Sequence, residues 1–215
     1  KQLKLQTDNI NVNETINNTN STNGGVYFQA ANTTDKVVFG TNGKVVVNNV
    51  YQLQWINTAL NGKYELGSNI DAGVTKTDTA NWGTTGFNPI GDNTNNFNGT
   101  FDGLGFTISN LYINRPDTNF VGLFGFTNNA TIKNIGLKDV DIIANINVGG
   151  LFGYMIDGTI KNSYVSGTVI GIRNVGTLVG ANDVGTISNS YASGSVSGNE
   201  YAGGLVGFNT GTISN

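Results

Sequence analysis

The chain of 215 residues has no cysteine and no histidine, and only 12% of its residues are charged. Without cysteine there is no disulfide framework, so packing and hydrogen bonds must stabilise the fold. Without histidine the chain lacks the commonest general base and a usual zinc ligand, and we predict no metal site and no cofactor. The net charge of −3 comes without a basic cluster, which argues against nucleic acid as a partner.

Long apolar runs are absent as well. None approaches the roughly 18 residues of a membrane-spanning helix, so we do not expect membrane insertion. The first residues, from Lys1, show no signal peptide. The last residues end inside a repeat, and stacked repeats need caps. We therefore expect the chain to be part of a longer protein.

Asparagine, threonine and glycine are plentiful instead, and they mark an internal repeat. The tetrapeptide Thr-Ile-x-Asn occurs at 107–110, 131–134, 159–162, 186–189 and 212–215. A glycine-rich segment precedes each of the last four copies, at 121–125, 148–153, 175–180 and 202–207. The residues between them alternate between apolar and polar at strand length and show no helical stripe. A repeat this short does not suit a propeller blade and fits one coil of a parallel β-helix.

Stacked coils place equivalent residues in ladders. We predict that the isoleucines of the motif form one inner column: Ile108, Ile132, Ile160, Ile187 and Ile213. The leucines of the glycine-rich segments form a second: Leu123, Leu151, Leu178 and Leu205. The asparagines of the motif should hydrogen-bond from coil to coil at a buried corner. At roughly 25 residues per coil the chain gives about eight coils.

Two segments interrupt the repeat. Apolar residues within 50–60 recur at helical spacing, which predicts one short helix packed on the solenoid, capped by Asn48 or Asn49. Residues 71–98 are polar and predict a long loop or a decorated coil, in which Trp82 is a candidate exposed aromatic residue.

The segments VGGLFG…GTIKNSYVSGTV and VGTLVG…GTISNSYASGSV resemble GLUG repeats. Such repeats occur in large bacterial surface proteins, including immunoglobulin A peptidases and filamentous-haemagglutinin-like adhesins. Residues 50–120, predicted to hold the helix and the polar excursion, resemble the segment that precedes such repeats in adhesins exported by two-partner secretion. The high-molecular-weight non-pilus adhesins are the most similar group that we identify. Residues 1–49 resemble haemagglutinin-type coils and residues 121–215 GLUG-type coils, within a single β-helical domain over 1–215.

The resemblance implies a right-handed parallel β-helix that is secreted through an outer-membrane transporter to the bacterial cell surface. It implies host-cell glycans or glycoproteins as partners, with sialylated glycoproteins as the ligands. It also implies asparagine-linked sugars, for which the Asn-x-Ser/Thr sequons are candidates: Asn13, Asn17, Asn20, Asn32, Asn98 and Asn129.

No set of residues predicts catalysis. The peptidases of the GLUG group would need a zinc motif with histidine, which the chain lacks. A glycosidase needs two carboxylates about 5–10 Å apart. The only close acidic pair is Asp139 and Asp141, for which a solvated strand face is the favoured interpretation. We predict a protein that is not an enzyme, and a carbohydrate-cleaving β-helix stays open as an alternative.

Two series of loops would stack along the edges of such a solenoid, and loops on a rigid scaffold commonly carry function. The series before the glycine-rich segments places the predicted glycan-binding residues on one edge: Asn147, Arg173, Asn174, Glu200 and Tyr201. Arg173 is the expected partner of a sialic-acid carboxylate, and a surface arginine without a ligand is the plainer interpretation. The other series offers Phe126, Tyr154 and Phe208.

The remaining aromatic and cationic candidates are Trp55, expected to pack within the helix, and Arg115, expected to fix a turn before Pro116. The sequence therefore favours a fragment of a surface adhesin that binds host-cell glycans. A purely structural shaft stays open, because the repeated residues build a scaffold and any specificity must lie in those that do not repeat.

Overall fold

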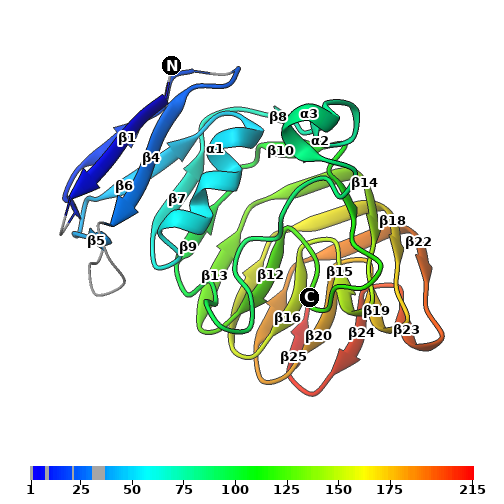
Figure 1. The fold of residues 1–215 in the computed structure, drawn as a ribbon. Coiled ribbons are helices and arrows are strands. Elements are labelled where there is room, and N and C mark those ends of the chain that lie inside the picture. Colours follow the sequence, from blue (N-terminus) through cyan, green and yellow to red (C-terminus); the bar gives the residue numbers. More distant parts are fainter. Residues whose placement is uncertain (1, 8–9, 21, 31–36) are drawn as a thin grey trace.

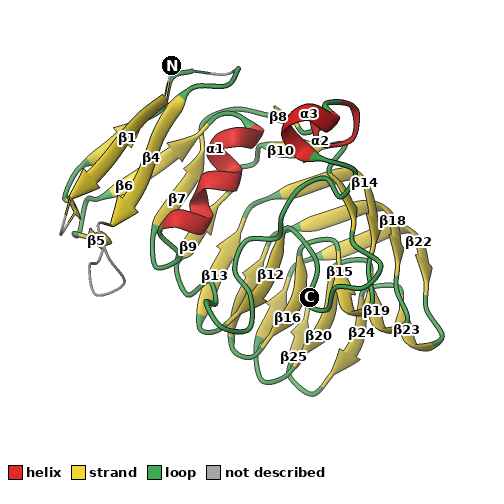
Figure 2. Ribbon diagram, in the orientation of Figure 1, coloured by secondary structure: helices red, strands yellow, loops and turns green. Residues whose placement is uncertain are grey.

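The computed structural model describes residues 2–7, 10–20, 22–30 and 37–215, and these form a parallel β-solenoid (Figure 1). Short strands joined by bends run around each coil, as the strands and loops of Figure 2 show. Successive coils pair in parallel, which is the arrangement predicted from the repeat. The solenoid has about seven turns, where chain length alone predicted about eight.

An eight-stranded sheet runs along the solenoid. Its strands are β3 (Thr15–Asn17), β6 (Lys44–Val47), β7 (Lys63–Leu66), β9 (Thr100–Asp102), β13 (Ala130–Lys133), β17 (Gly158–Lys161), β21 (Thr186–Ser188) and β25 (Thr212–Ser214). A six-stranded sheet lies beside it. Its strands are β8 (Ile70–Asp71), β10 (Thr107–Ser109), β11 (Tyr112–Asn114), β14 (Gly136–Ile143), β18 (Tyr164–Ile170) and β22 (Tyr191–Ser197).

Smaller sheets complete the coils. One contains β12 (Phe124–Thr127), β16 (Phe152–Met155), β20 (Val179–Asn182) and β24 (Val206–Asn209). Another contains β15 (Ile146–Gly149), β19 (Arg173–Gly176) and β23 (Glu200–Gly203). Near the N-terminus β1 (Gln2–Thr7) pairs with β4 (Gly25–Ala30), and β2 (Ile10–Val12) pairs with β5 (Val37–Phe39).

The predicted isoleucine ladder forms, with one correction. The isoleucines of the last four motif copies pair in register within the eight-stranded sheet. Ile108 is buried too, but it lies in the six-stranded sheet and pairs with Leu137. Phe101 takes the place predicted for Ile108. The prediction was wrong because Thr-Phe-Asp at 100–102 has the same polar–apolar–polar alternation, which does not distinguish one sheet from the next.

The predicted leucine column is buried. Leu123, Leu151 and Leu178 have no exposed surface, and Leu205 is partly buried against the core. Alongside it, the rings of Phe124 and Phe152 meet edge to face with centroids 5.5 Å apart. In these coils the leucine and the apolar residue that follows it, such as Phe124 or Phe152, both belong to one continuous core.

The asparagines of the motif lie at bends. Asn134, Asn162 and Asn189 have φ values of 55°, 51° and 46°, a left-handed backbone that asparagine tolerates better than most residues. Asn162 Nδ2 donates to Asn134 Oδ1 at 3.0 Å, and Asn189 Nδ2 to Asn162 Oδ1 at 3.3 Å. The coil-to-coil ladder is confirmed. The buried corner is wrong, because the bends lie on the surface and leave Asn162 and Asn189 exposed.

The short helix predicted within 50–60 is present as two joined pieces, the α-helix α1 (Val50–Gln54) and the 3-10 helix η1 (Trp55–Thr58). Asn49 caps it, because its side chain accepts a hydrogen bond from Gln52 N at 2.9 Å. Leu53 turns inward and is fully buried. Both pieces contact β4, and Figure 1 shows α1 lying in front of the solenoid strands.

Residues 71–98 form a decorated coil rather than an open loop. Two single-turn helices, α2 (Val74–Thr77) and α3 (Thr79–Trp82), follow β8. The chain then returns along β12, where Phe97 N donates to Phe126 O at 3.0 Å. β7 pairs directly with β9, so residues 67–99 all lie between two adjacent strands of the eight-stranded sheet. This stretch is longer than the roughly 25 residues expected for one coil, and the solenoid therefore has fewer turns than chain length predicted.

Trp82 is only 7% exposed, so the prediction of an exposed aromatic residue was wrong. Its ring lies 5.3 Å from that of Tyr51 and stacks 6.0 Å from that of Phe87. Tertiary packing against the helix, which local polarity does not reveal, covers it.

Candidate functional site

The predicted glycan site lies where two columns of side chains run along one edge of the solenoid. The first column consists of the residue that directly precedes each glycine-rich segment. Because β15, β19 and β23 pair in register, these residues stack from coil to coil: Phe120, Asn147, Asn174 and Tyr201. The second column pairs across β12, β16, β20 and β24: Phe126, Tyr154, Ala181 and Phe208. The two loop series of the sequence therefore meet in one place.

All four residues of the first column have a left-handed backbone. Their φ values lie between 52° and 60°, a conformation that costs most L-residues about 1–2 kcal/mol. Asn147 and Asn174 follow the usual preference for asparagine in this conformation. Phe120 and Tyr201 do not, so two aromatic rings stand where the backbone favours an amide.

The two asparagines are bonded to each other. Asn174 Nδ2 donates to Asn147 Oδ1 at 2.6 Å, and both residues are less than a tenth exposed. This bond uses one of the two N–H groups of Asn174 and one lone pair of Asn147, so each amide keeps further hydrogen-bonding capacity. Their first role is structural, as rungs of an amide ladder.

The aromatic rings of the second column stack and are then interrupted. Phe126 and Tyr154 stack with centroids 5.1 Å apart at 21°, and Phe120 meets Tyr154 edge-on at 5.8 Å. Two coils further along, Phe208 lies 6.0 Å from Tyr201. Between them Ala181 carries only a methyl group. One coil of the solenoid therefore lacks a ring in both columns.

A cavity of about 410 Å³ opens at this interruption. Its lining contains all five predicted glycan-binding residues together with two rings from the second column: Asn147, Arg173, Asn174, Glu200, Tyr201, Tyr154 and Phe208. Tyr154 and Phe208 are two coils apart, which is about 10 Å along the solenoid. That separation leaves room for one flat ring between the two aromatic walls.

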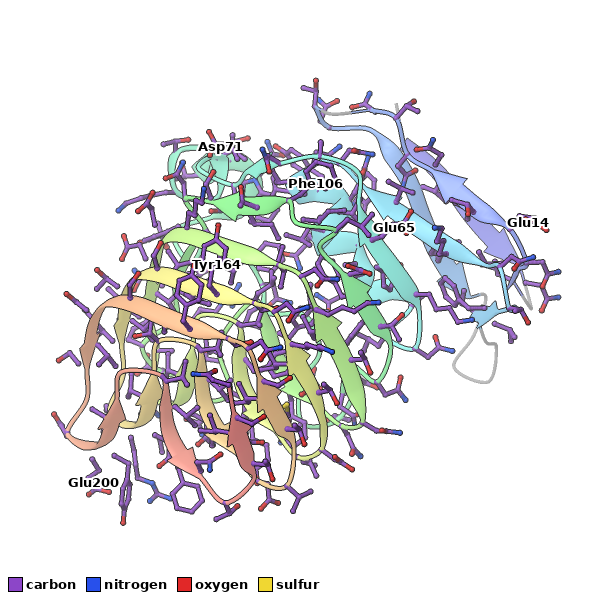
Figure 3. The ribbon with its side chains drawn as sticks, turned by 180° about the vertical axis from the view of Figure 1, so that it is seen from behind. Glu14, Glu65, Asp71, Phe106, Tyr164 and Glu200 are labelled. Carbon is purple, nitrogen blue, oxygen red and sulfur yellow. The ribbon has the colours of Figure 1, made fainter. Side chains whose placement is uncertain are left out.

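Charged groups stand at the rim of the cavity. Arg173 and Glu200 pair in register across β19 and β23, and both are exposed. Neither takes part in any of the ion pairs among the described residues. Figure 3 shows Glu200 at the end of the solenoid remote from Glu14. A guanidinium and a carboxylate without partners provide donors and acceptors for a polar ligand.

Tyr154 also contributes a phenol to the lining of the cavity. Burial, and after it the nearby carboxylate of Asp183, raises the pKa of Tyr154 above its ordinary value. The phenol therefore stays protonated at neutral pH and can both donate and accept a hydrogen bond.

Five of the six candidate glycosylation sites are exposed: Asn13, Asn17, Asn20, Asn98 and Asn129. Asn32 lies outside the described residues. Asn20 also organises a turn, because its Oδ1 accepts hydrogen bonds from three successive backbone N–H groups of residues 22–24. Exposure of these asparagines is necessary for their modification.

The acidic pair is not arranged as two free carboxylates on a regular strand. The register of β14 shifts between Leu137 and Val140, and Asp139 has a left-handed backbone with φ 54°. Asp141 forms an ion pair with Lys76 at 2.7 Å. A bulge thus disturbs the simple strand face on which the pair was predicted to lie.

Sequence reasoning missed Phe120 and Ala181. A signal for both was present, because aligning the glycine-rich segments shows Phe, Asn, Asn, Tyr just before them and Phe, Tyr, Ala, Phe just after them. The cavity lies at the coil where both series lack a ring.

Among the described residues, no helix is long and apolar enough to span a membrane.

Comparison with known proteins identifies the repeat. Residues 144–170 match the family described as the GLUG motif. The chain is 41% identical over 109 residues to halomucin of Haloquadratum walsbyi, covering 48% of this chain and 1% of that protein. It is 45% identical over 56 residues to a candidate Gly-rich membrane protein of Evansella cellulosilytica, covering 26% of this chain and 6% of that one. The chain thus spans only a small part of either relative.

A solved structure is similar as well. It is described as a candidate immunoglobulin A1 protease from Bacteroides ovatus, and the match has a TM-score of 0.46 and 17% identity, covering 80% of this chain and 63% of that one. The family match confirms the GLUG part of the predicted resemblance for residues 144–170, and the chain is a β-solenoid that carries this motif.

Proposed function

We propose that this chain is the glycan-binding part of a large surface-displayed or secreted adhesin, and that sialylated host glycoproteins bind in the cavity beside Ala181. The observation that carries the proposal is the interrupted ring column. A continuous scaffold would repeat its rings or its amides in every coil, whereas here one coil has neither ring and a cavity opens there.

The lining suits a sugar acid. Tyr154 and Phe208 offer aromatic faces for the C–H face of a pyranose ring, and sugar sites combine such faces with a few placed polar groups. Arg173 can hold a carboxylate in the bidentate geometry that arginine favours. Glu200 and the amide of Asn174 can bond sugar hydroxyl groups.

The strained aromatic residue supports the same conclusion. Tyr201 has a left-handed backbone, although asparagine at this position would be easier to accommodate and would extend the amide ladder from Asn174. Residues held in uncommon backbone conformations cluster at functional sites, where local preference is given up for another purpose. Contact between the Tyr201 ring and a ligand supplies that purpose.

Surface display and export belong to the proposal as well. One of the similar proteins is described as a Gly-rich membrane protein, which supports a location at the cell surface. Two-partner secretion through an outer-membrane transporter, and modification of the exposed sequons, rest on the resemblance described above. The absence of cysteine accords with passage through a pore in an unfolded state.

A structural shaft is the second candidate. The hydrogen bond between Asn147 and Asn174 favours it, because it shows that part of the predicted site already serves the scaffold. In that case the cavity would bind no glycan and the chain would serve only to separate other parts of a longer protein. We further propose that the chain is not an enzyme, which a reducing-sugar release assay on bound glycans would check.

A glycan array tests the proposed function. Wild-type protein should bind sialylated glycans above background, and Arg173→Ala should weaken this binding roughly tenfold or more, because a hydrogen bond to a charged group contributes about 1.5–3 kcal/mol. Lys161→Ala is the matched control, since it removes one exposed positive charge from β17, which does not line the cavity. The proposal fails if no glycan binds above background, or if both variants lose binding equally.

A further inference from the structure

A second cavity lies between the helical segment α1–η1 and the decorated coil. Its volume is about 530 Å³, and Tyr51, Trp55, Trp82 and Arg115 contribute to its lining. None of these residues lines the cavity beside Ala181. Three aromatic rings and one cation thus surround a space that the predicted glycan site does not use.

Two side-chain amides of the helical segment hold the walls of this cavity in place. Gln54 pairs with the backbone of Asn88, donating from Nε2 to its carbonyl oxygen at 2.8 Å and accepting from its N–H at 2.9 Å. Asn57 likewise accepts from Gly91 N at 2.9 Å and donates to Pro89 O at 3.2 Å. These bonds fix the coil against the helix, so the cavity exists before any ligand arrives, which lowers the cost of binding.

The aromatic wall contains a polar group without a partner. Trp82 packs between Tyr51 and Phe87. Its Nε1 is buried and donates to no atom of the described residues. A buried donor left unpaired is energetically unfavourable. A ligand oxygen that reached this nitrogen would remove that cost.

Arg115 supplies an unpaired positive charge. It is half-buried, and its Nε donates to Phe87 O at 3.3 Å. Among the described residues it takes part in no ion pair. Burial lowers the pKa of its guanidinium below the ordinary value, yet arginine remains charged at neutral pH. A partly desolvated cation without a carboxylate partner is costly in isolation and gains most from an anionic ligand. The prediction that Arg115 fixes a turn therefore describes only part of its surroundings.

We infer that this cavity is a binding site for an anionic saccharide, whose carboxylate or sulfate group bonds to Arg115 while a sugar ring lies against Trp55 and Tyr51. The preformed walls, the aromatic faces and the single cation without an ion-pair partner together specify a ligand with an apolar ring face and an anionic group beside it. This site does not depend on the cavity beside Ala181, and either can exist without the other.

Tryptophan fluorescence isolates this site. The chain contains two tryptophans, and both line this cavity while neither lines the other. Trigalacturonate, its neutral methyl ester and a sulfated galactose trisaccharide are titrated separately against the full chain. We expect a saturable change in emission with the carboxylated or the sulfated sugar, whichever anion fits, and none with the ester. Arg115→Gln should weaken binding roughly tenfold to a hundredfold. Lys161→Ala removes an exposed positive charge that lines neither cavity and should leave the titration unchanged.

The thermal unfolding midpoint of each variant serves as the folding control. Should Arg115→Gln fail to fold, Arg115→Lys keeps the charge, loses the planar fork and should still bind several-fold more weakly than wild type. The inference is overturned if neither anionic sugar gives a saturable change in emission or heat of binding at millimolar concentration. It is equally overturned if the neutral ester binds as well as the acid. A failed glycan array with a positive fluorescence titration would reject the proposed function and keep this site.

Discussion

Tyr201 has the backbone conformation that asparagine has at the same position of the two preceding coils. The left-handed region is unfavourable for a bulky side chain because Cβ crowds the following carbonyl oxygen. Asparagine reduces this penalty and, in Asn147 and Asn174, adds an amide-to-amide bond. At the scale of single residues, the exceptions to the ladder therefore carry more information about function than its regular members.

Tyr201→Asn should affect stability and binding in opposite directions. The free energy of unfolding should stay constant or rise by up to about 1 kcal/mol, because the left-handed backbone suits asparagine. Sialylated glycan binding should weaken several-fold, because an aromatic wall of the cavity is lost. Urea unfolding and binding to an immobilised glycan measure the two quantities.

Tyr191→Asn is the matched control for this substitution. Tyr191 is exposed and stacks on Tyr164 with centroids 5.0 Å apart, away from the cavity. Its replacement should destabilise the chain slightly and leave binding unchanged. A Tyr201→Asn protein that binds as tightly as wild type would show that the ring is not part of the site.

At the scale of elements, one ion pair joins β9 to β13. The Asp102 carboxylate lies 3.0 Å from Lys133 Nζ, and its Oδ1 accepts hydrogen bonds from Asn134 Nδ2 and Leu104 N. Burial of Asp102 favours the neutral acid, but the hydrogen bonds from Asn134 and Leu104, with the charge of Lys133, outweigh it and lower the pKa below its ordinary value of 3.8. The Asp102 carboxylate therefore connects two coils and also holds the turn at Leu104.

The lowered pKa of Asp102 predicts a pH dependence. A carboxylate with a lower pKa in the folded state contributes stability that is fully present above the unfolded-state pKa and is lost as pH falls through the folded-state pKa. Asp102→Asn should therefore be less stable than wild type at pH 6, and the difference should shrink below about pH 4. Urea unfolding of both proteins from pH 2.5 to 6 checks this. A difference that stays constant with pH would contradict the assignment.

The elements that repeat could be predicted from the sequence, and those that occur once could not. The motif at 131–134 and its later copies gave the correct ladder because neighbouring coils impose the same register on each. Ile108 was misplaced because two strands with similar alternation compete for one position. The exposure of Trp82 was predicted wrongly because Tyr51, which packs against it, lies 31 residues earlier in helix α1. The edge residues of the site were found from loop stacking, whereas the cavity itself depends on the missing ring at Ala181.

At the scale of the whole molecule, each coil is stabilised by its two neighbours, as expected for a solenoid. Burial along the isoleucine ladder reflects this: Ile160 has no exposed surface, whereas Ile213 in the last described coil is 43% exposed. Ile160→Ala should cost about 2–5 kcal/mol of unfolding free energy, since it opens a cavity in the core. Ile213→Ala should cost less than about half as much, because less apolar surface is lost. Equal losses in urea unfolding would contradict a stack stabilised by neighbours.

The ladders form a rigid frame that fixes the positions of the side chains along its edges. The central claim is that a sialylated glycan binds where the column of rings is interrupted at Ala181. The most direct test is a titration of isotope-labelled protein with sialyllactose, followed by the backbone amide chemical shifts. We predict saturable shifts concentrated at Arg173, Asn174 and Tyr201, with the amides of the β13–β17 ladder unchanged. Absence of any shift at the cavity beside Ala181 at saturating sugar, with the fold intact, would contradict the claim.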